Sequence, residues 1–220
     1  MNSNEINNFN SQQQNEAIIF DSQILFAESF VCLLKTMHLF NIVNHTNRED
    51  ELWKSFLSKK TTHVFLDYNI RGVNTYRLVK KIIENFPCIN VVIVSTTQNV
   101  FIIQRMLNAG VKAFISKTSR TAELSVCLQS IAIGRKYLSP DLKLLMNEHA
   151  NDLHPINFTD KEIQVLRSIA DGCTISQTAD ILRVSKHTIV AHRRNMMGKT
   201  GINSAPGLVK FGMDAGLITV

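Results

Sequence analysis

The sequence predicts an α/β domain built on a doubly wound sheet of five parallel strands, followed by a smaller all-α domain of four helices. Three observations predict this division. Short apolar runs alternate with helix-period segments from residue 17 to residue 138, and only helical periodicity remains beyond Phe158. A chain of 220 residues also suits two modest domains better than one.

The expected strands and helices of the first domain alternate strictly. Apolar runs predict strands at 17–20, 63–66, 91–94 and 113–115, with a weaker strand near 41–45. Helical spacing predicts helices at 24–37, 49–58, 75–85, 100–109 and 122–133. Helices that connect parallel strands cover both faces of the sheet, and sites lie beyond the carboxyl ends of the strands. Residues that follow strand ends are therefore the first candidates for chemistry.

Two polar segments flank this domain. Residues 1–16 are rich in Asn, Gln and Ser, which predicts a disordered tail. Residues 139–157 are predicted to be a linker that contains one helix, at 141–148. The α/β domain is therefore expected at 17–138 and the all-α domain at 158–220.

Composition narrows the function classes. The chain is 45% hydrophobic and carries a formal net charge of +6, so it is expected to fold and to suit an anionic partner. No stretch approaches 18 apolar residues, and the start lacks the layout of a signal peptide, so we expect a cytoplasmic protein with no membrane partner. Four widely spaced cysteines predict buried, reduced thiols rather than a zinc site or a disulfide scaffold: Cys32, Cys88, Cys127 and Cys173.

The all-α domain has the signals of a helix-turn-helix. Thr159 and Glu162 form a capping box for its first helix, and Thr174 can cap the second. A three-residue turn, 183–185, precedes a third helix at 185–199, and Pro206 lies near the start of a fourth. Two short helices joined by a tight turn place the second of them in the major groove of DNA. We therefore predict 185–199 to be the reading helix.

The charge of the reading helix supports this prediction. It holds four basic residues and no acid, although the chain after residue 150 is only +2. Lys186 and His187 lie at its N-terminal end, where side chains reach bases, and the later basic residues suit phosphates. The predicted DNA-binding residues are Ser185, Lys186, His187, Thr188, Val190, Ala191, His192, Arg193, Arg194 and Lys199. The alternative to DNA binding is that the basic face of this helix is simply exposed to solvent and that the four helices form a domain with a structural role only.

The sequence from Phe158 to the end resembles the LuxR/NarL-type DNA-binding domain. The resemblance rests on 158–162, Val165-Leu166, 169–172, 184–189, His192, Lys199, Gly201 and 216–218. Three positions depart from the family pattern: Val190 and Ala205 replace polar or basic residues, and Gly207 replaces an acid. Each lost basic residue removes about one phosphate contact. Val190 is also suited to a thymine methyl group.

Four polar residues follow strand ends in the first domain. Asp21 follows the first strand, Asp67 the third, Ser95 the fourth and Lys117 the fifth. Two carboxylates can hold Mg²⁺, one of them can attack phosphorus, and a hydroxyl and an ammonium can hold the oxygens of the resulting acylphosphate. The pattern therefore predicts a phosphorylatable switch rather than an enzyme active site.

This constellation resembles the receiver domain of two-component response regulators, with Leu25-Phe26, 67–72, Ala109-Gly110 and 114–117 in register. With the second domain, the whole chain resembles a NarL/FixJ-class response regulator. The resemblance implies Asp67 as phosphoacceptor, a pocket of Asp21, Ser95 and Lys117, and Mg²⁺ on Asp21 and Asp67. It also implies Ser95 and Phe114 as switch residues, a histidine kinase as phosphodonor, and a homodimer on duplex DNA; RNA polymerase stays open as a further partner.

The receiver resemblance has two departures. Receivers carry two adjacent acids after the first strand, but here Ser22 follows Asp21, which weakens the Mg²⁺ site. Arg71 also replaces a proline before Gly72. The alternative is therefore a degenerate receiver controlled by a partner protein, a ligand or its abundance. Two rival classes also stay open: an FMN-binding flavodoxin-like enzyme, disfavoured by the acidic and apolar first loop, and an adaptor that binds DNA weakly.

Overall fold

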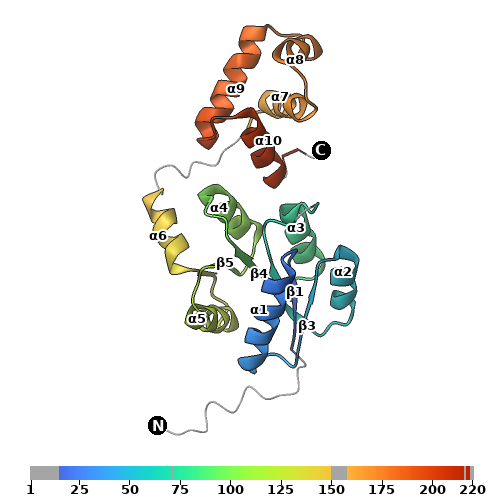
Figure 1. Ribbon diagram of the computed structural model, residues 1–220, viewed down its shortest axis with the longest axis vertical. Helices are drawn as coiled ribbons and strands as arrows, with labels where there is room; N and C mark the ends of the chain where they lie inside the picture. Colours follow the sequence, from blue (N-terminus) through green and yellow to red (C-terminus); the bar gives the residue numbers. More distant parts are fainter. Residues whose placement is uncertain (1–14, 71, 150–157, 216, 219–220) are drawn as a thin grey trace.

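The computed structural model describes residues 15–70, 72–149, 158–215 and 217–218. Figure 1 shows an α/β domain followed by a separate group of helices near the C-terminus. Residues 1–14 of the predicted tail, Arg71, residues 150–157 of the predicted linker, Gly216 and residues 219–220 lie outside the described residues.

A single parallel sheet organises the first domain. Its strands are β1 (Glu16–Phe20), β2 (Ile42–Thr46), β3 (Thr61–Leu66), β4 (Asn90–Ser95), β5 (Ala113–Ser116) and β6 (Tyr137–Leu138), in the spatial order β2-β1-β3-β4-β5-β6. All five predicted strands are present, and β1 starts one residue earlier than expected. The prediction of five strands was wrong by one, because β6 has only two residues and no periodicity to reveal it.

Helices cover both faces of this sheet. They are α1 (Ile24–Thr36), α2 (Glu49–Leu57), α3 (Thr75–Asn85), α4 (Val100–Ala109), α5 (Thr121–Ala132) and α6 (Pro140–Glu148). Neighbouring strand residues point to opposite faces: Ile18 and Phe20 pack with α2, α3 and α4, whereas Ala17 and Ile19 pack with α1 and α5. Burial on both faces explains why the strands are near-continuous apolar runs.

The second domain is a bundle of four helices: α7 (Asp160–Ala170), α8 (Ile175–Leu182), α9 (Lys186–Thr200) and α10 (Ala205–Asp214). Both predicted caps are observed as capping boxes, Thr159 with Glu162 and Thr174 with Gln177. Val165, Leu166 and Ile189 are buried in its core. One aromatic contact joins the domains, because the ring centroids of Phe101 on α4 and Phe211 on α10 lie 5.6 Å apart.

The four cysteines are free thiols, as predicted, but they are not all buried. Cys127 is buried on α5, and desolvation raises the pKa of its thiol to about 12. Cys32 and Cys88 are exposed, so the prediction of buried thiols was wrong for them. Cys32 lies on the outer side of α1, a position that the spacing of cysteines cannot reveal.

Candidate functional site

The predicted pocket lies at the carboxyl ends of the strands β1, β3, β4 and β5. Asp21 and Asp67 are 2% and 3% exposed, and Ser95 at the end of β4 is fully buried. Lys117, directly after β5, is brought alongside by a backbone hydrogen bond from its own N–H to the carbonyl of Ser95, at 2.9 Å. Residues separated by almost a hundred positions therefore converge because parallel strands end at one edge of the sheet.

The Lys117 ammonium bridges the two carboxylates. Its Nζ lies 2.7 Å from Asp21 Oδ2 and 3.3 Å from Asp67 Oδ2, and its side chain is 6% exposed. Burial of ionised groups is costly unless opposite charges and hydrogen bonds compensate for it. The pocket thus contains two carboxylates and one cation, and its formal charge is −1.

Sequence reasoning missed two supports of this lysine, Gln23 and Phe26. The Gln23 side-chain oxygen accepts a hydrogen bond from Lys117 Nζ at 3.2 Å, and the Gln23 backbone N–H donates to Asp21 Oδ1 at 2.7 Å. The Phe26 ring centroid lies 4.3 Å from Lys117 Nζ, which is a cation–π contact. Their closeness in sequence to Asp21 was the available signal, because the loop after β1 must turn into α1 beside the pocket.

The donor set fits a hard cation only in part. Both oxygens of Asp21 are engaged, by Lys117 and by the Gln23 N–H, whereas buried Asp67 Oδ1 has no hydrogen-bond partner. This carboxylate oxygen is free to act as a ligand, and Mg²⁺ prefers oxygen ligands. Within the described residues, however, no cluster of three or more His, Cys, Asp or Glu side chains is arranged to hold a metal. Ser22, in the place of the second acid, is exposed.

The predicted switch residues belong to neighbouring strands, Ser95 to β4 and Phe114 to β5. Ser95 Oγ accepts a hydrogen bond from the Thr97 N–H at 3.4 Å, at the start of the loop that leads to α4. Asn99 ends this loop, and its side chain caps α4 by accepting from the N–H groups of Phe101 and Ile102. Phe114 is fully buried on β5 among the side chains of the α3–α4 face. A chain of short contacts therefore connects the end of β4 to Phe101, which contacts α10.

The second candidate site is the surface of α9. The turn before it contains Arg183 in the left-handed conformation (φ 54°), and Ser185 caps α9 by accepting from the Thr188 N–H. Ile189 and Met196 face the core of the bundle. The opposite side is open: the side chains of the ten predicted DNA-binding residues are exposed or half-buried, and Val190 is 41% exposed.

Lys199 differs from the other basic residues of α9. Its Nζ lies 2.7 Å from Oε2 of Glu162, which belongs to the capping box of α7. Burial acts to raise the pKa of Glu162, but hydrogen bonds from Lys199 and Thr159 outweigh it and hold this pKa below its usual value. Lys199 thus joins α9 to α7, and its role as a phosphate contact stays a prediction.

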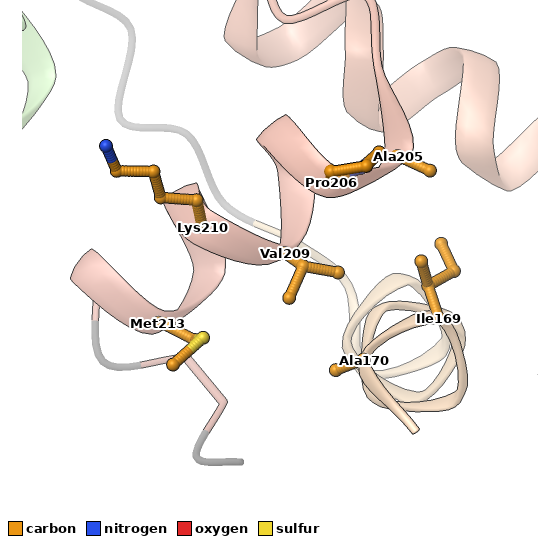
Figure 2. A pocket seen from close by; sticks show the side chains of 7 residues that line it. All are labelled: Ile169, Ala170, Ala205, Pro206, Val209, Lys210 and Met213. Carbon is orange, nitrogen blue, oxygen red and sulfur yellow. The ribbon is translucent and has the colours of Figure 1, made fainter. Parts of the chain in front are cut away.

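A hollow of about 500 Å³ lies between α7 and α10 (Figure 2). Lys210 is the charged residue of its lining, which is otherwise apolar. The full lining is Ile169, Ala170, Ala205, Pro206, Val209, Lys210 and Met213. Ala205, one of the departures noted above, therefore contributes to an apolar surface.

The departure at Gly207 has a steric reason. A Cβ on this residue would lie 2.7 Å from Cγ2 of Ile202 and 2.8 Å from Oγ of Ser204. Ser204 caps α10 by accepting a hydrogen bond from the Gly207 N–H. Glycine therefore allows the close approach of the capping side chain.

Comparison with protein families decides between the classes left open by the sequence. Residues 17–129, just over half of the chain, match the model of the response regulator receiver domain. Residues 157–211 match the model of bacterial regulatory proteins of the luxR family. The chain belongs to the response regulators with a LuxR-type helix-turn-helix domain. These are DNA-binding transcription regulators, a class that is not enzymatic, and the FMN-enzyme alternative is set aside.

Individual relatives agree with this assignment. The chain is 31% identical over 119 residues to the uncharacterized response regulatory protein YgeK of Escherichia coli, covering 53% of this chain and 79% of that protein. It is 24% identical to a nitrate/nitrite response regulator homolog of Haemophilus influenzae, over 88% of this chain and 93% of that protein. The match to the second relative spans both domains.

Solved structures share the fold. RcsB of Salmonella enterica serovar Typhimurium, bound to the promoter rprA in the presence of a phosphomimetic, matches with a TM-score of 0.73 at 19% identity, over 93% of this chain and 100% of that chain. A structure of two RcsB dimers bound to two parallel DNAs matches with a TM-score of 0.70 at 20% identity, over 90% and 97% of the two chains. No described helix of this response regulator is long and apolar enough to cross a membrane.

Proposed function

We propose that this response regulator binds specific duplex DNA through α9 and that phosphorylation of Asp67 controls the binding. The observation that carries the proposal is the open basic side of α9, whose N-terminal residues Lys186 and His187 are exposed beyond a tight helix-turn-helix turn. Side chains at that end of a reading helix reach base edges, and Arg193 and Arg194 further along suit phosphates.

Affinity selection from a random duplex library tests the DNA-binding part. We expect a defined sequence to emerge with wild type, and Lys186→Ala to weaken binding to it. Lys210→Ala is the matched control, because Lys210 lies on α10 beside the apolar hollow and not on α9. Equal losses in both variants would show that only bulk charge drives binding.

The proposed phosphoryl chemistry uses the chain's own groups. An oxygen of Asp67 attacks the phosphorus of the phosphodonor, a histidine kinase or a small acyl phosphate, and the donor leaves with the bonding electrons. In this proposal, Lys117 and the hydroxyl of Ser95 hold the oxygens of the transferred phosphoryl group. Asp67 and Asp21 would hold Mg²⁺, which would supply positive charge to neutralise the incoming phosphoryl group.

Intact-protein mass spectrometry after incubation with acetyl phosphate and Mg²⁺ tests this chemistry. Wild type is expected to gain one phosphoryl group and Asp67→Asn none. Asp171→Asn is the control, since Asp171 is an exposed acid at the end of α7. Unmodified wild type would rule out phosphorylation under these conditions.

A homodimer is part of the proposal. Ile24 and Leu25 at the start of α1 are 54% and 79% exposed, so the receiver presents apolar side chains that a second copy would cover. A two-fold symmetric pair places two reading helices on a palindromic site.

Control without phosphorylation is the second candidate function. The observation that favours it is the bridging position of Lys117, whose ammonium already neutralises part of the charge of Asp21 and Asp67. In that case a partner protein, a ligand or abundance sets the DNA-binding activity.

A further inference from the structure

The Lys117 ammonium stands at the end of a long side chain, yet contacts on several sides fix its place. It donates hydrogen bonds to Asp21 Oδ2 at 2.7 Å and to Gln23 Oε1 at 3.2 Å, and it lies 3.3 Å from Asp67 Oδ2. The ring centroid of Phe26 lies 4.3 Å from Nζ. A lysine side chain has many rotamers, so an ammonium that is already in place loses little further freedom when it binds a phosphoryl oxygen.

The Phe26 ring is itself fixed by a column of aromatic rings. Phe26 and Phe30 lie one turn apart on α1, and their stacked rings have centroids 5.6 Å apart. The Phe30 ring meets the ring of Phe65 edge to face, with centroids 5.2 Å apart. Phe65 is buried on β3, two residues before Asp67. The ring beside the ammonium is therefore anchored to the strand that carries the phosphoacceptor.

Gln23 is fixed through its backbone. It is the N-cap residue of α1, its N–H donates to Asp21 Oδ1 at 2.7 Å, and its carbonyl accepts from the Ala27 N–H at 2.9 Å. Gln23 is exposed, whereas the Lys117 side chain is only 6% exposed. The Gln23 amide therefore meets the ammonium at the outer edge of the pocket.

These contacts place the ammonium on the Asp21 side of the pocket. Its distance to Asp21 Oδ2 is shorter than its distance to Asp67 Oδ2, and buried Asp67 Oδ1 has no hydrogen-bond partner. An ammonium that closed fully on Asp67 would stabilise this carboxylate and make it a weaker nucleophile. The neutral oxygen of Gln23 and the face of the Phe26 ring attract the cation without adding a formal negative charge to a pocket that must accept a phosphoryl group.

We propose that Phe26 and Gln23 are positioning residues for phosphoryl transfer. They hold the Lys117 ammonium beside Asp21, so that it receives an oxygen of the phosphoryl group while Asp67 Oδ1 stays free to attack phosphorus. As the bond from Asp67 to phosphorus forms, the bond from phosphorus to the donor oxygen breaks, and the donor leaves with that electron pair. The effect on the rate rests on the proposed function, whereas the contact between the ring and the ammonium exists without it.

Time courses of phosphorylation by acetyl phosphate and Mg²⁺, followed by intact-protein mass spectrometry, test the ring. Phe26→Leu keeps an apolar side chain but removes the aromatic face, and it is expected to slow phosphorylation about fivefold. Phe40→Leu is the matched control and is expected to leave the rate unchanged. Phe40 is a partly buried ring packed against the same part of the core, but it precedes β2 at the amino edge of the sheet.

A graded series separates the electrostatics of the ring from its bulk. Replacement of Phe26 by mono-, di- and trifluorinated phenylalanine nearly preserves the shape of the ring but weakens its negative face step by step. The rate of phosphorylation is expected to fall with each step. Equal rates throughout the series would show that the ring only fills space, and would overturn its positioning role.

The amide is tested by a substitution of similar length. Gln23→Met removes the acceptor and is expected to slow phosphorylation about threefold, because one hydrogen bond to the ammonium is lost. Gln164→Met is the control, since Gln164 accepts a hydrogen bond from Lys161 at 3.4 Å on the exposed surface of α7. Equal rates of these two variants would remove Gln23 from the proposal.

Proton–carbon NMR spectra of the full chain observe Lys117 without any phosphodonor. The ring current of Phe26 is expected to shift the ε-methylene protons of Lys117 upfield of those of exposed Lys161. Phe26→Leu is expected to abolish this shift and Phe26→Tyr to retain it. Gln23→Met is expected to reduce it, because the ammonium is no longer held at the outer edge of the pocket.

The two measurements separate the failure of this inference from the failure of the proposed function. Unshifted ε-methylene protons in wild type would overturn the contact and the inference with it. Equal rates of Phe26→Leu and Phe40→Leu, in a protein whose wild type is phosphorylated, would overturn the inference alone. A wild type with shifted protons that takes up no phosphoryl group would overturn the proposed function, and the positioning role would fall with it.

Discussion

In the receiver pocket, Asp21, Asp67 and Lys117 are almost wholly buried, and the ammonium lies within 3.3 Å of both carboxylates. On α9, by contrast, Lys186 and Arg194 are exposed, and the described structure offers them no acidic partner. Charges that compensate one another inside a protein respond strongly to a change at any one of them. Charges left open to water are available to an external polyanion. We therefore expect the receiver pocket to respond to phosphorylation and the surface of α9 to bind DNA.

The largest expected effect comes from removing the buried cation. Lys117→Met leaves Asp21 and Asp67 facing each other without compensation, and we expect the receiver to lose about 3–5 kcal/mol of stability near neutral pH. Urea unfolding measures the loss. Lys80→Met is the control, since its pair with Glu84 spans 3.9 Å between largely exposed side chains and contributes under about 1 kcal/mol. Equal losses would remove the distinction between buried and exposed charge.

Acid is expected to weaken the receiver through His63. Burial of this β3 side chain, whose ring packs against Phe40, lowers its pKa from 6.5 to about 4. Between about pH 6.5 and pH 4, His63 therefore binds a proton in the unfolded chain but not in the folded chain. The free energy of unfolding falls as the pH drops through this range, by roughly 3 kcal/mol in all. Unfolding at a series of pH values measures the slope.

The substitution His63→Gln should reduce that slope. His45→Gln, at an exposed position of the edge strand β2, is the matched control and should leave it in place. An unchanged slope in His63→Gln would assign the acid sensitivity to other groups.

The reading helix is tested by base discrimination. Lys186→Ala is expected to cost about 1–3 kcal/mol on the selected site and less on unrelated DNA, because a base contact carries sequence information. Lys161→Ala on α7 is the control, an exposed lysine of the same bundle outside α9. Uniform weakening on all sequences would make Lys186 a phosphate contact instead.

The smallest expected effect concerns salt. Arg194→Ala should reduce the slope of log affinity against log salt by about 0.9, the contribution of one phosphate contact. Arg167→Ala, exposed on α7, should leave the slope unchanged. Titrations at several salt concentrations with both variants decide the point.

Much of this division was predictable from the sequence. Strand ends located Asp21, Asp67, Ser95 and Lys117, because apolar runs in an α/β pattern fix where parallel strands terminate. The start of α9 was predictable because serine is a common N-cap residue, and the side chain of Ser185 accepts a hydrogen bond from the Thr188 N–H in the first turn of the helix. Strand ends and helix starts that several sequence signals indicate together were therefore predicted correctly.

Features that depend on single contacts were not predictable. The strand β6 has two residues, and its pairing of Tyr137 with Ala113 is a tertiary contact without a sequence period. The Phe26 ring beside Lys117 and the bond from Lys199 to Glu162 join positions far apart in the chain. Arg183 adopts a left-handed conformation that a non-glycine residue rarely favours, so composition gave no sign of it.

The most direct test of the link between the two regions is a fluorescence-polarisation titration on the selected duplex, with and without acetyl phosphate and Mg²⁺. If a charge change at Asp67 controls α9, wild type binds at least about fivefold more tightly with the phosphodonor, and Asp67→Ala does not respond. Identical affinities of wild type in the two conditions would contradict phosphorylation control and leave the DNA-binding surface under another input.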